Sequence, residues 1–140
     1  LALMYDEGEG TPEDNQAAIR WYSAAAEQGE RNAQYNLAIM YDEGEGTPED
    51  NAQAIRWYTA AASQGEASAM FNLAIMYMNG EGIRTNNAMA YMLFALSAGQ
   101  GLEGAREARD VMADELSASQ LKTARRAAAE WTVGEALPSL

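Results

Sequence analysis

Apolar residues recur along this chain with the spacing of an amphipathic helix, and the whole arrangement returns every 36 residues. In the middle copy, Ala33, Leu37, Met40 and Tyr41 lie at positions i, i+4, i+7 and i+8. That spacing places them on one face of a helix, which we expect from about residue 30 to residue 42. We name this element the A helix of the repeat.

A turn and a second helix, the B helix, follow in the same copy. Gly44 can adopt the left-handed conformation that ends an α-helix. Thr47 is expected to be the N-cap of the B helix, with Pro48 as its first residue and Asp50 three residues after the cap. The B helix is then expected to reach Gln64.

The B helix is apolar around most of its circumference, which is typical of a helix packed between neighbours. We therefore expect the recurring tryptophans, Trp21 and Trp57, to be core residues rather than parts of a ligand site. The apolar B-helix positions of the middle copy are Ala54, Ile55, Trp57, Tyr58, Ala61 and Ala62.

The repeat has three copies. Residues 1–36 and 37–72 are identical at 27 of 36 positions, and a more divergent copy starts at Leu73, in which Thr85 or Asn86 can cap the B helix. We therefore expect helical repeats over residues 1–101, at about 1–29, 30–65 and 66–101. The first copy lacks the helical turns that precede Leu37 in the second, so we expect the chain to be part of a longer protein.

After the repeats, the pattern changes to a pair of helices with polar outer faces, over residues 102–133. One helix is expected from Glu103 to Leu116, and Ser117 and Gln120 have the spacing of a capping box that begins the next helix. A stack of helical repeats needs such a polar-faced end. Residues 134–140 are expected to form an irregular tail.

The residue types exclude several functions. The chain has no cysteine and no histidine, which excludes disulfides and thiolate zinc sites and removes the commonest general base. Its net charge is −12, and residues 1–66 contribute −10 of it. An acidic surface repels phosphate groups, so no nucleic-acid partner is expected. Direct membrane insertion is not expected either, because no apolar run is long enough to span a bilayer.

Several residues of the repeat are specific enough to indicate a family. The segment AQYNLAIMY from Ala33 to Tyr41, the glycines Gly44 and Gly46, and the pattern AxxWYxxAAxxG that starts at Ala54 closely resemble the Sel1-like repeat, a relative of the tetratricopeptide repeat. The resemblance covers residues 1–108, and the helical pair after them looks like the terminal cap of such arrays. The chain lacks the bridging cysteines of one bacterial subfamily, so activities suggested for that branch are not carried over.

The resemblance implies an all-α fold, a right-handed α-α superhelix (solenoid) of Sel1-like helical hairpins with a C-terminal capping helix. It also implies that the A helices line the concave face. Members of the family act as adaptors in protein complexes, for example in membrane-protein degradation and in bacterial signalling and envelope systems. We therefore expect a non-catalytic interaction scaffold that binds a peptide or protein segment on the concave face.

The candidate partner-binding residues are the A-helix positions that lie between the core positions. A matched row of apolar side chains rimmed by acids is typical of a peptide-binding surface. The alternative is that the aromatic and aliphatic members of the row simply pack between adjacent A helices. The candidates are Tyr35, Ile39, Asp42 and Glu43 in the second copy, and Phe71, Ile75, Met78 and Asn79 in the third.

Other functions fit the residues less well. The acidic loops at residues 6–14 and 42–50 lack the alternating acids of a calcium loop, so neither a metal nor a cofactor is expected. A glycoside hydrolase could use carboxylates alone, but a catalytic acid has no reason to recur in every repeat, so no catalytic residue is assigned. The chain could instead be a structural spacer or a regulatory appendage of a larger protein. Leu1, Leu3 and Met4 could support self-association through the truncated N-terminal face.

Overall fold

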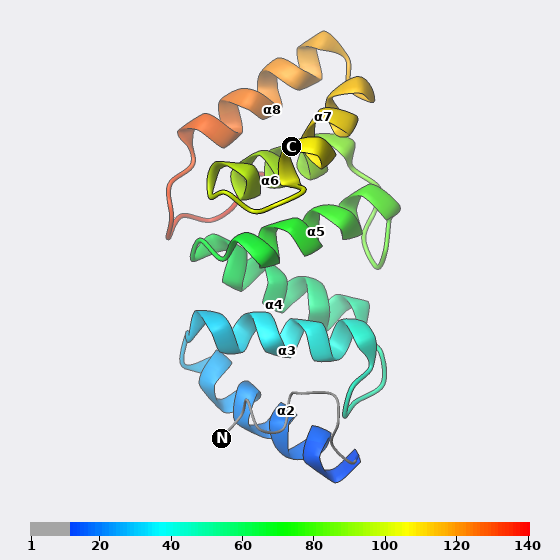
Figure 1. Cartoon of the computed structure of the whole chain (residues 1–140), viewed down its shortest axis with the longest axis vertical. Helices are drawn as coiled ribbons and strands as arrows, with labels where there is room; N and C mark the ends of the chain where they lie inside the picture. The colour runs from blue at the N-terminus through cyan, green and yellow to red at the C-terminus, as the bar shows by residue number, and fades with distance from the viewer. Residues whose placement is uncertain (1–11) are drawn as a thin grey trace. The chain divides into compact units, whose positions relative to one another are not determined.

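The computed structural model describes residues 12–140, and every regular element in that range is an α-helix (Figure 1). Contacts group the chain into two compact units, residues 1–61 and residues 62–140. The A helices of the second and third copies are α3 and α5, and the B helices are α2, α4 and α6. The helices are α2 (Pro12–Glu27), α3 (Arg31–Glu43), α4 (Asn51–Ser63), α5 (Ala67–Asn79), α6 (Asn87–Gly99), α7 (Ala105–Asp114) and α8 (Ala118–Glu130).

In the first unit, a short turn joins α2 to α3, and side chains fix both sides of it. The Glu30 carboxylate caps α3, because it accepts hydrogen bonds from the backbone N–H groups of Asn32 and Ala33 at 3.1 and 2.7 Å. The buried side chain of Gln34 donates to the carbonyl of Ala26 in the last turn of α2, at 3.3 Å. Both ends of the turn are therefore held by hydrogen bonds that replace lost helical ones.

The B helix of this unit starts later than the sequence predicted. Thr47 was expected to cap it, with Pro48 as its first residue, but α4 begins at Asn51. Its cap is Asp50, whose carboxylate accepts from the backbone N–H of Gln53 at 3.1 Å. The prediction of Thr47 as the N-cap is therefore wrong.

The reason is a backbone hydrogen bond that closes the turn between α3 and α4. Gly44 ends α3 in the left-handed conformation, with φ of 73°, as expected. The chain then turns back, and the backbone N–H of Asp50 donates to the carbonyl of Tyr41 at 2.8 Å. Residues 47–50 lie outside the helix on this return path, so the first helical turn can form only after Asp50.

The third copy closes its turn in the same way, inside the second unit. Gly80 is left-handed with φ of 72°, and the N–H of Asn86 donates to the carbonyl of Tyr77 at 3.0 Å. The Asn86 side chain caps α6 by accepting from the N–H of Met89 at 3.0 Å. The prediction that Asn86 can cap this helix is confirmed.

Helix α6 is the centre of the second unit, where it packs against α5, α7 and α8 (Figure 1). Six consecutive residues, Met89–Phe94, are buried on all sides of the helix. The hydroxyl of Ser97, also buried, donates to the carbonyl of Ala67 at the start of α5 at 3.0 Å. A helix that is apolar around its circumference is stable only when it is covered in this way.

The terminal pair closes the second unit. Helix α7 is shorter than the range Glu103–Leu116 expected from the sequence, and it buries Ala105 and Met112. The predicted capping box at the start of α8 is confirmed, because Ser117 and Gln120 bond to each other's backbone N–H groups at 3.1 and 2.9 Å.

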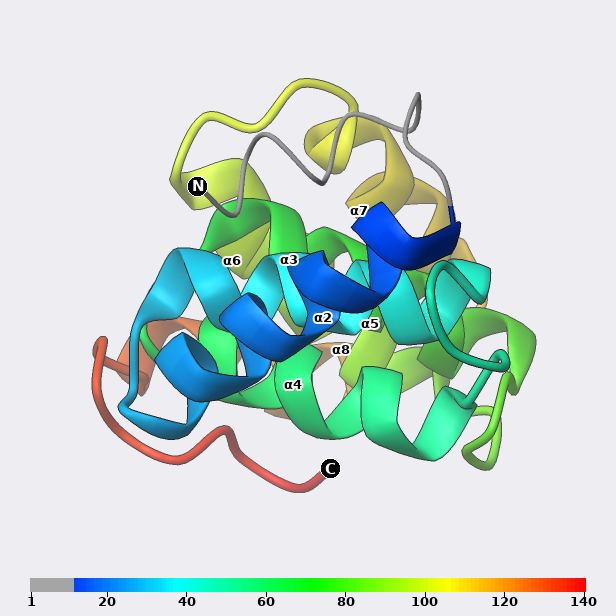
Figure 2. The ribbon, with the colours of Figure 1, turned by 90° about the horizontal axis from the view of Figure 1, so that it is seen from below.

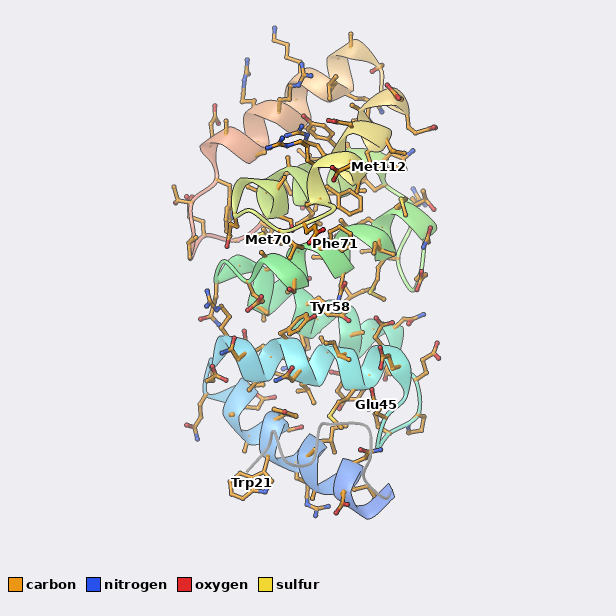
Figure 3. The ribbon with its side chains drawn as sticks, viewed as in Figure 1. Trp21, Glu45, Tyr58, Met70, Phe71 and Met112 are labelled. Carbon is orange, nitrogen blue, oxygen red and sulfur yellow. The ribbon has the colours of Figure 1, made fainter. Side chains whose placement is uncertain are left out.

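The two recurring tryptophans have different surroundings. Trp57 is 6% exposed, as expected of a core residue, whereas Trp21 is 52% exposed, so the core prediction for Trp21 is wrong. Helix α2 buries Ala18, Tyr22 and Ala26, which lie four residues apart on one face. Trp21 lies about 100° around the helix from Tyr22, and Figure 3 shows it extending from α2 on the side away from α3.

A glycine in the α3–α4 turn provides a test of how this turn packs. Gly46 has φ of 74°, and a Cβ atom there would lie 2.6 Å from the backbone oxygen of Asn15 in α2. Gly46→Ala therefore combines backbone strain with a clash against backbone that has little room to move. We expect it to lower the free energy of unfolding, measured by urea denaturation, by about 2–4 kcal/mol.

Gly29→Ala is the matched control in the same unit. Gly29 has φ of 88°, but a Cβ atom added there would meet nothing within 4 Å, so only strain applies. We expect a loss of about 1 kcal/mol for this variant. Equal losses for the two variants would contradict the close approach of Gly46 to α2.

Candidate partner-binding surfaces

Each A helix buries one side and leaves a second side partly open. The candidate partner-binding residues lie on the open side, and none of them is fully buried. Glu43 and Asn79 are exposed, and the other six candidates are half-buried. The buried residues are Ala33, Gln34, Leu37, Ala38 and Met40 in α3, and, one repeat later, Ala69, Met70, Leu73, Ala74 and Met76 in α5.

On α3, two of the candidates contact the same B-helix residue, Tyr58 (labelled in Figure 3), which is 1% exposed. The rings of Tyr35 and Tyr58 pack with centroids 6.2 Å apart and a tilt of 49°. The Tyr58 hydroxyl donates a hydrogen bond to Oδ2 of Asp42 at 3.0 Å. Tyr35 and Asp42 therefore help to hold α3 on α4, and a partner can reach only the parts of them that stay open.

On α5, the aromatic candidate makes the corresponding contact. The rings of Phe71 (labelled in Figure 3) and Phe94 pack edge to face, with centroids 5.1 Å apart and an interplanar angle of 67°. The exposed side chain of Asn79 donates to the Glu81 carboxylate at 3.0 Å, just after the helix ends. Ile75 lies between these positions on the same half-buried stripe.

The polar pair of the first unit has an apolar counterpart in the second. Asp42 and Tyr58, which share a hydrogen bond, correspond one repeat later to Met78 and Phe94. A buried polar group left without its partner would cost about 1–3 kcal/mol. Because the third copy lacks both polar groups, it does not incur this cost. This paired change between the copies is the signal in the sequence that A-helix candidates contact the B helix, and helical spacing alone does not show it.

We name the two open sides by their helices. The α3 stripe comprises Tyr35, Ile39, Asp42 and Glu43, and the α5 stripe comprises Phe71, Ile75, Met78 and Asn79. Residues four apart lie on the same face of a helix, so each stripe is continuous along its own helix.

Two carboxylates of the acidic loop at residues 42–50 make structural hydrogen bonds. Asp42 accepts from Tyr58 and Asp50 caps α4, so the two do not converge on a common point. A cavity of about 480 Å³ beside this loop is lined by one carboxylate only, that of Glu45. Within the described part of the chain, no three acidic side chains come close enough together to hold a metal ion.

Two further expectations concern the ends and the membrane. The apolar residues Leu1, Leu3 and Met4, expected to support self-association, lie outside the described residues. Among the helices from residue 12 onward, none combines the length and the apolar character needed to cross a lipid bilayer.

Helical hairpins of one fixed length, with the same turn closure and the same open stripe, define an all-α repeat protein. The model of the Sel1 repeat family matches residues 1–30, 31–66 and 67–102. The chain therefore belongs to the Sel1 repeat family, as the resemblance of its motifs indicated.

Solved structures share this fold. A protective antigen present in uropathogenic Escherichia coli strains, which displays an SLR fold, is 30% identical over 98% of this chain, with a TM-score of 0.87. A Sel1 repeat protein from Oxalobacter formigenes is 32% identical over 81% of this chain, with a TM-score of 0.74. The matched region is 30% of the first protein and 47% of the second, so the chain spans less than half of either. A search of curated proteins gave no match.

These comparisons confirm the predicted all-α repeat fold. Sel1 repeats are generally protein-interaction modules, and the two similar structures are of bacterial proteins. The fold is typical of scaffolds without enzymatic activity. Because a fold hosts a function only through its site, the binding surface of this chain has to be argued from its own residues.

The contribution of the hydrogen bond between Tyr58 and Asp42 to stability can be tested by mutation. Tyr58→Phe removes the hydroxyl but keeps the ring, and we expect it to lower the free energy of unfolding by about 1 kcal/mol. A double-mutant cycle with Asp42→Asn, followed by urea denaturation, should show a coupling energy of about 0.5–1 kcal/mol. A coupling near zero would mean that the hydrogen bond between Tyr58 and Asp42 does not contribute to the free energy of unfolding.

The dismissal of calcium binding is testable by thermal denaturation. Extracellular calcium modules bind in the range of about 10⁻⁴–10⁻³ M, so millimolar calcium would stabilise a real site by mass action. We expect the Tm to stay the same as in magnesium at equal ionic strength. A rise of several degrees in calcium alone would overturn the interpretation of the acidic loops as structural turns.

Proposed function

We propose that the chain is a non-catalytic protein-interaction module whose partner contacts are made by the α3 stripe and the α5 stripe. The observation that supports this most is that the same helix positions, 36 residues apart, stay partly open. Three positions between them are fully buried in each helix, namely Leu37, Ala38 and Met40 in α3 and Leu73, Ala74 and Met76 in α5. Repeated apolar and aromatic groups with a polar end suit a peptide or protein segment.

The two stripes differ in the chemistry they offer. The α3 stripe ends in Asp42 and the exposed Glu43, so it suits a segment that carries a basic side chain. The α5 stripe ends in Met78 and Asn79, and it suits a more apolar segment. Methionine adapts its shape to different apolar partners, which favours a tolerant surface.

The acidic residues support the non-catalytic part of the proposal. Glu30, Glu66 and Asp50 cap helices, and Asp42 accepts from Tyr58. Glu27 pairs with Arg56 at 3.5 Å across α2 and α4. A glycoside hydrolase would need two carboxyl groups facing each other across a cleft, whereas these five have structural contacts.

The proposal is tested by reversing or adding charge at the exposed end of each stripe. Glu43 and Asn79 are exposed, so the double variant Glu43→Arg, Asn79→Arg should change the free energy of unfolding by no more than about 0.5 kcal/mol. The wild type and the variant are each immobilised and exposed to an extract of the source cells. We expect the variant to capture at least about fivefold less of the proteins that bind specifically to the wild type, because the new positive charges are unfavourable for partners that suit the wild-type surface. Quantitative mass spectrometry measures the captured proteins.

Glu103→Arg is the matched control, since Glu103 is an exposed acid in the turn before α7 and belongs to neither stripe. It should capture the same proteins as the wild type. Equal capture by all three chains would refute the stripes as the binding surface. Capture no greater than that of the bare matrix would refute the interaction module itself.

A further inference from the structure

The methionines of this chain fall into two groups by exposure. The chain has eight methionines, and all but Met4 lie in the described residues. The buried ones have exposed fractions of 5% or less, whereas the side chain of Met78 is half-buried. Met78 is therefore the only methionine among residues 12–140 that is partly open to solvent. The buried methionines are Met40, Met70, Met76, Met89, Met92 and Met112.

Burial protects the other methionines from oxidants. A peroxide must reach the sulfur atom to oxidise it, and a fully buried side chain becomes accessible only when the structure around it opens. The sulfur of Met70 also accepts a hydrogen bond from the side-chain amide of Gln100, at 3.9 Å. Oxidation of a buried methionine would place a polar S=O group inside an apolar core, which is unfavourable. Both effects disfavour reaction at the buried positions.

Met78 lies in the last turn of α5, from which the loop of residues 80–86 projects (Figures 1 and 2). Its neighbour Asn79 is exposed, so solvent reaches this end of the helix. Met78 is also an apolar member of the α5 stripe, together with Phe71 and Ile75. Residues three and four apart share a helix face, so a change in the polarity of Met78 alters the surface that the whole stripe presents.

The repeat itself indicates that a polar group is tolerated at this position. The residue one repeat earlier is Asp42, which is half-buried in the last turn of α3, as Met78 is in the last turn of α5. The same helical turn therefore forms with a carboxylate in that place. Asp42 accepts a hydrogen bond from Tyr58, whereas Phe94, the counterpart of Tyr58, has no hydroxyl to donate. A new oxygen on Met78 would obtain no hydrogen bond from Phe94.

We propose that Met78 is the site at which a peroxide oxidises this protein, and that its oxidation weakens the binding of an apolar segment to the α5 stripe. The sulfur gives an electron pair to one oxygen of hydrogen peroxide, so the S–O bond forms as the O–O bond breaks. The other oxygen leaves as hydroxide and takes the proton of the transferred hydroxyl group to form water. The sulfur is oxidised by two electrons to the sulfoxide, and the peroxide is reduced.

The two stripes respond differently to the oxidant. The sulfoxide turns a flexible apolar side chain into a polar one, and an apolar partner that covers it removes its oxygen from water. The α3 stripe contains no methionine, so its chemistry does not change. The oxidation site stands on the burial of the methionines alone, whereas the effect on binding rests on the proposed function of the α5 stripe.

The first experiment treats the chain with hydrogen peroxide and follows each methionine by peptide mapping with mass spectrometry. All chains carry Met4→Leu, a volume-conserving change, so that every remaining methionine is one that the structure describes. We expect Met78 to be oxidised at least about tenfold faster than each buried methionine, because only the buried ones require opening of the fold. Circular dichroism should show no loss of helix once Met78 is oxidised. Equal or slower oxidation at Met78, or a loss of helix, would overturn the proposal.

The second experiment measures binding before and after this oxidation. Its probe is the set of extract proteins that the unoxidised chain captures and its Asn79→Arg variant does not, so these proteins depend on the α5 stripe. We expect the oxidised chain to capture at least about threefold less of this set, and methionine sulfoxide reductases with a dithiol to restore the capture. Met78→Leu is the matched control, because leucine stays apolar and has no sulfur. Its capture of the set should not change after peroxide treatment.

The proteins lost from a Glu43→Arg variant depend on the α3 stripe, and the oxidised chain should still capture them. Unchanged capture of the α5-dependent set after oxidation, or an equal loss in the Met78→Leu chain, would overturn the effect of Met78 on binding. If no extract protein depends on Asn79, the proposed function of the α5 stripe fails and its control by oxidation fails with it. The peptide map decides the oxidation site in either case, so the two failures are distinguishable.

Discussion

The hairpins of this protein depend on one backbone hydrogen bond, which closes the turn between the A helix and the B helix. In the first unit it runs from the N–H of Asp50 to the carbonyl of Tyr41, and in the second from Asn86 to Tyr77. Each bond pairs a carbonyl near the end of one helix with the N–H of the residue that caps the next, so two otherwise unpaired groups satisfy each other. The bond requires a left-handed glycine after the A helix, and it sets where the B helix can begin.

The closed hairpin also decides what surface is left for binding. A B-helix aromatic ring, Tyr58 or Phe94, packs under the A-helix ring of the same repeat, Tyr35 or Phe71. The A-helix ring is therefore held on one edge and open on the other, which fixes its orientation at little further entropic cost when a partner binds. The stripes proposed for binding are thus by-products of the packing that builds the repeat. A family of scaffolds can vary such positions without changing its fold.

The sequence predicted those features that arise from local interactions. The A helices, the glycine that ends α3 and the capping box of α8 depend on residues within one or two turns of each other. Thr47 resembled a cap because Thr-Pro is a common helix start. The bond from the N–H of Asp50 to the carbonyl of Tyr41 instead keeps residues 47–50 outside the helix. The exposure of Trp21 depends on what packs against α2, which its own helical pattern does not state. The course of residues 132–140 depends on Ser63 and Asn86, far away in the sequence. For the binding residues, spacing predicted which positions stay open, but not that Asp42 bonds to Tyr58.

The matched change from Asp42 and Tyr58 to Met78 and Phe94 has a consequence for how such chains can be recombined. An A helix taken from one copy and a B helix taken from the other would place a carboxylate against a ring that has no hydroxyl, or a hydroxyl against a thioether. Either mixture would leave a polar group short of its partner in a partly buried place. Exchange of a whole hairpin would therefore keep this pair matched, whereas a crossover inside the turn would produce a mismatched pair.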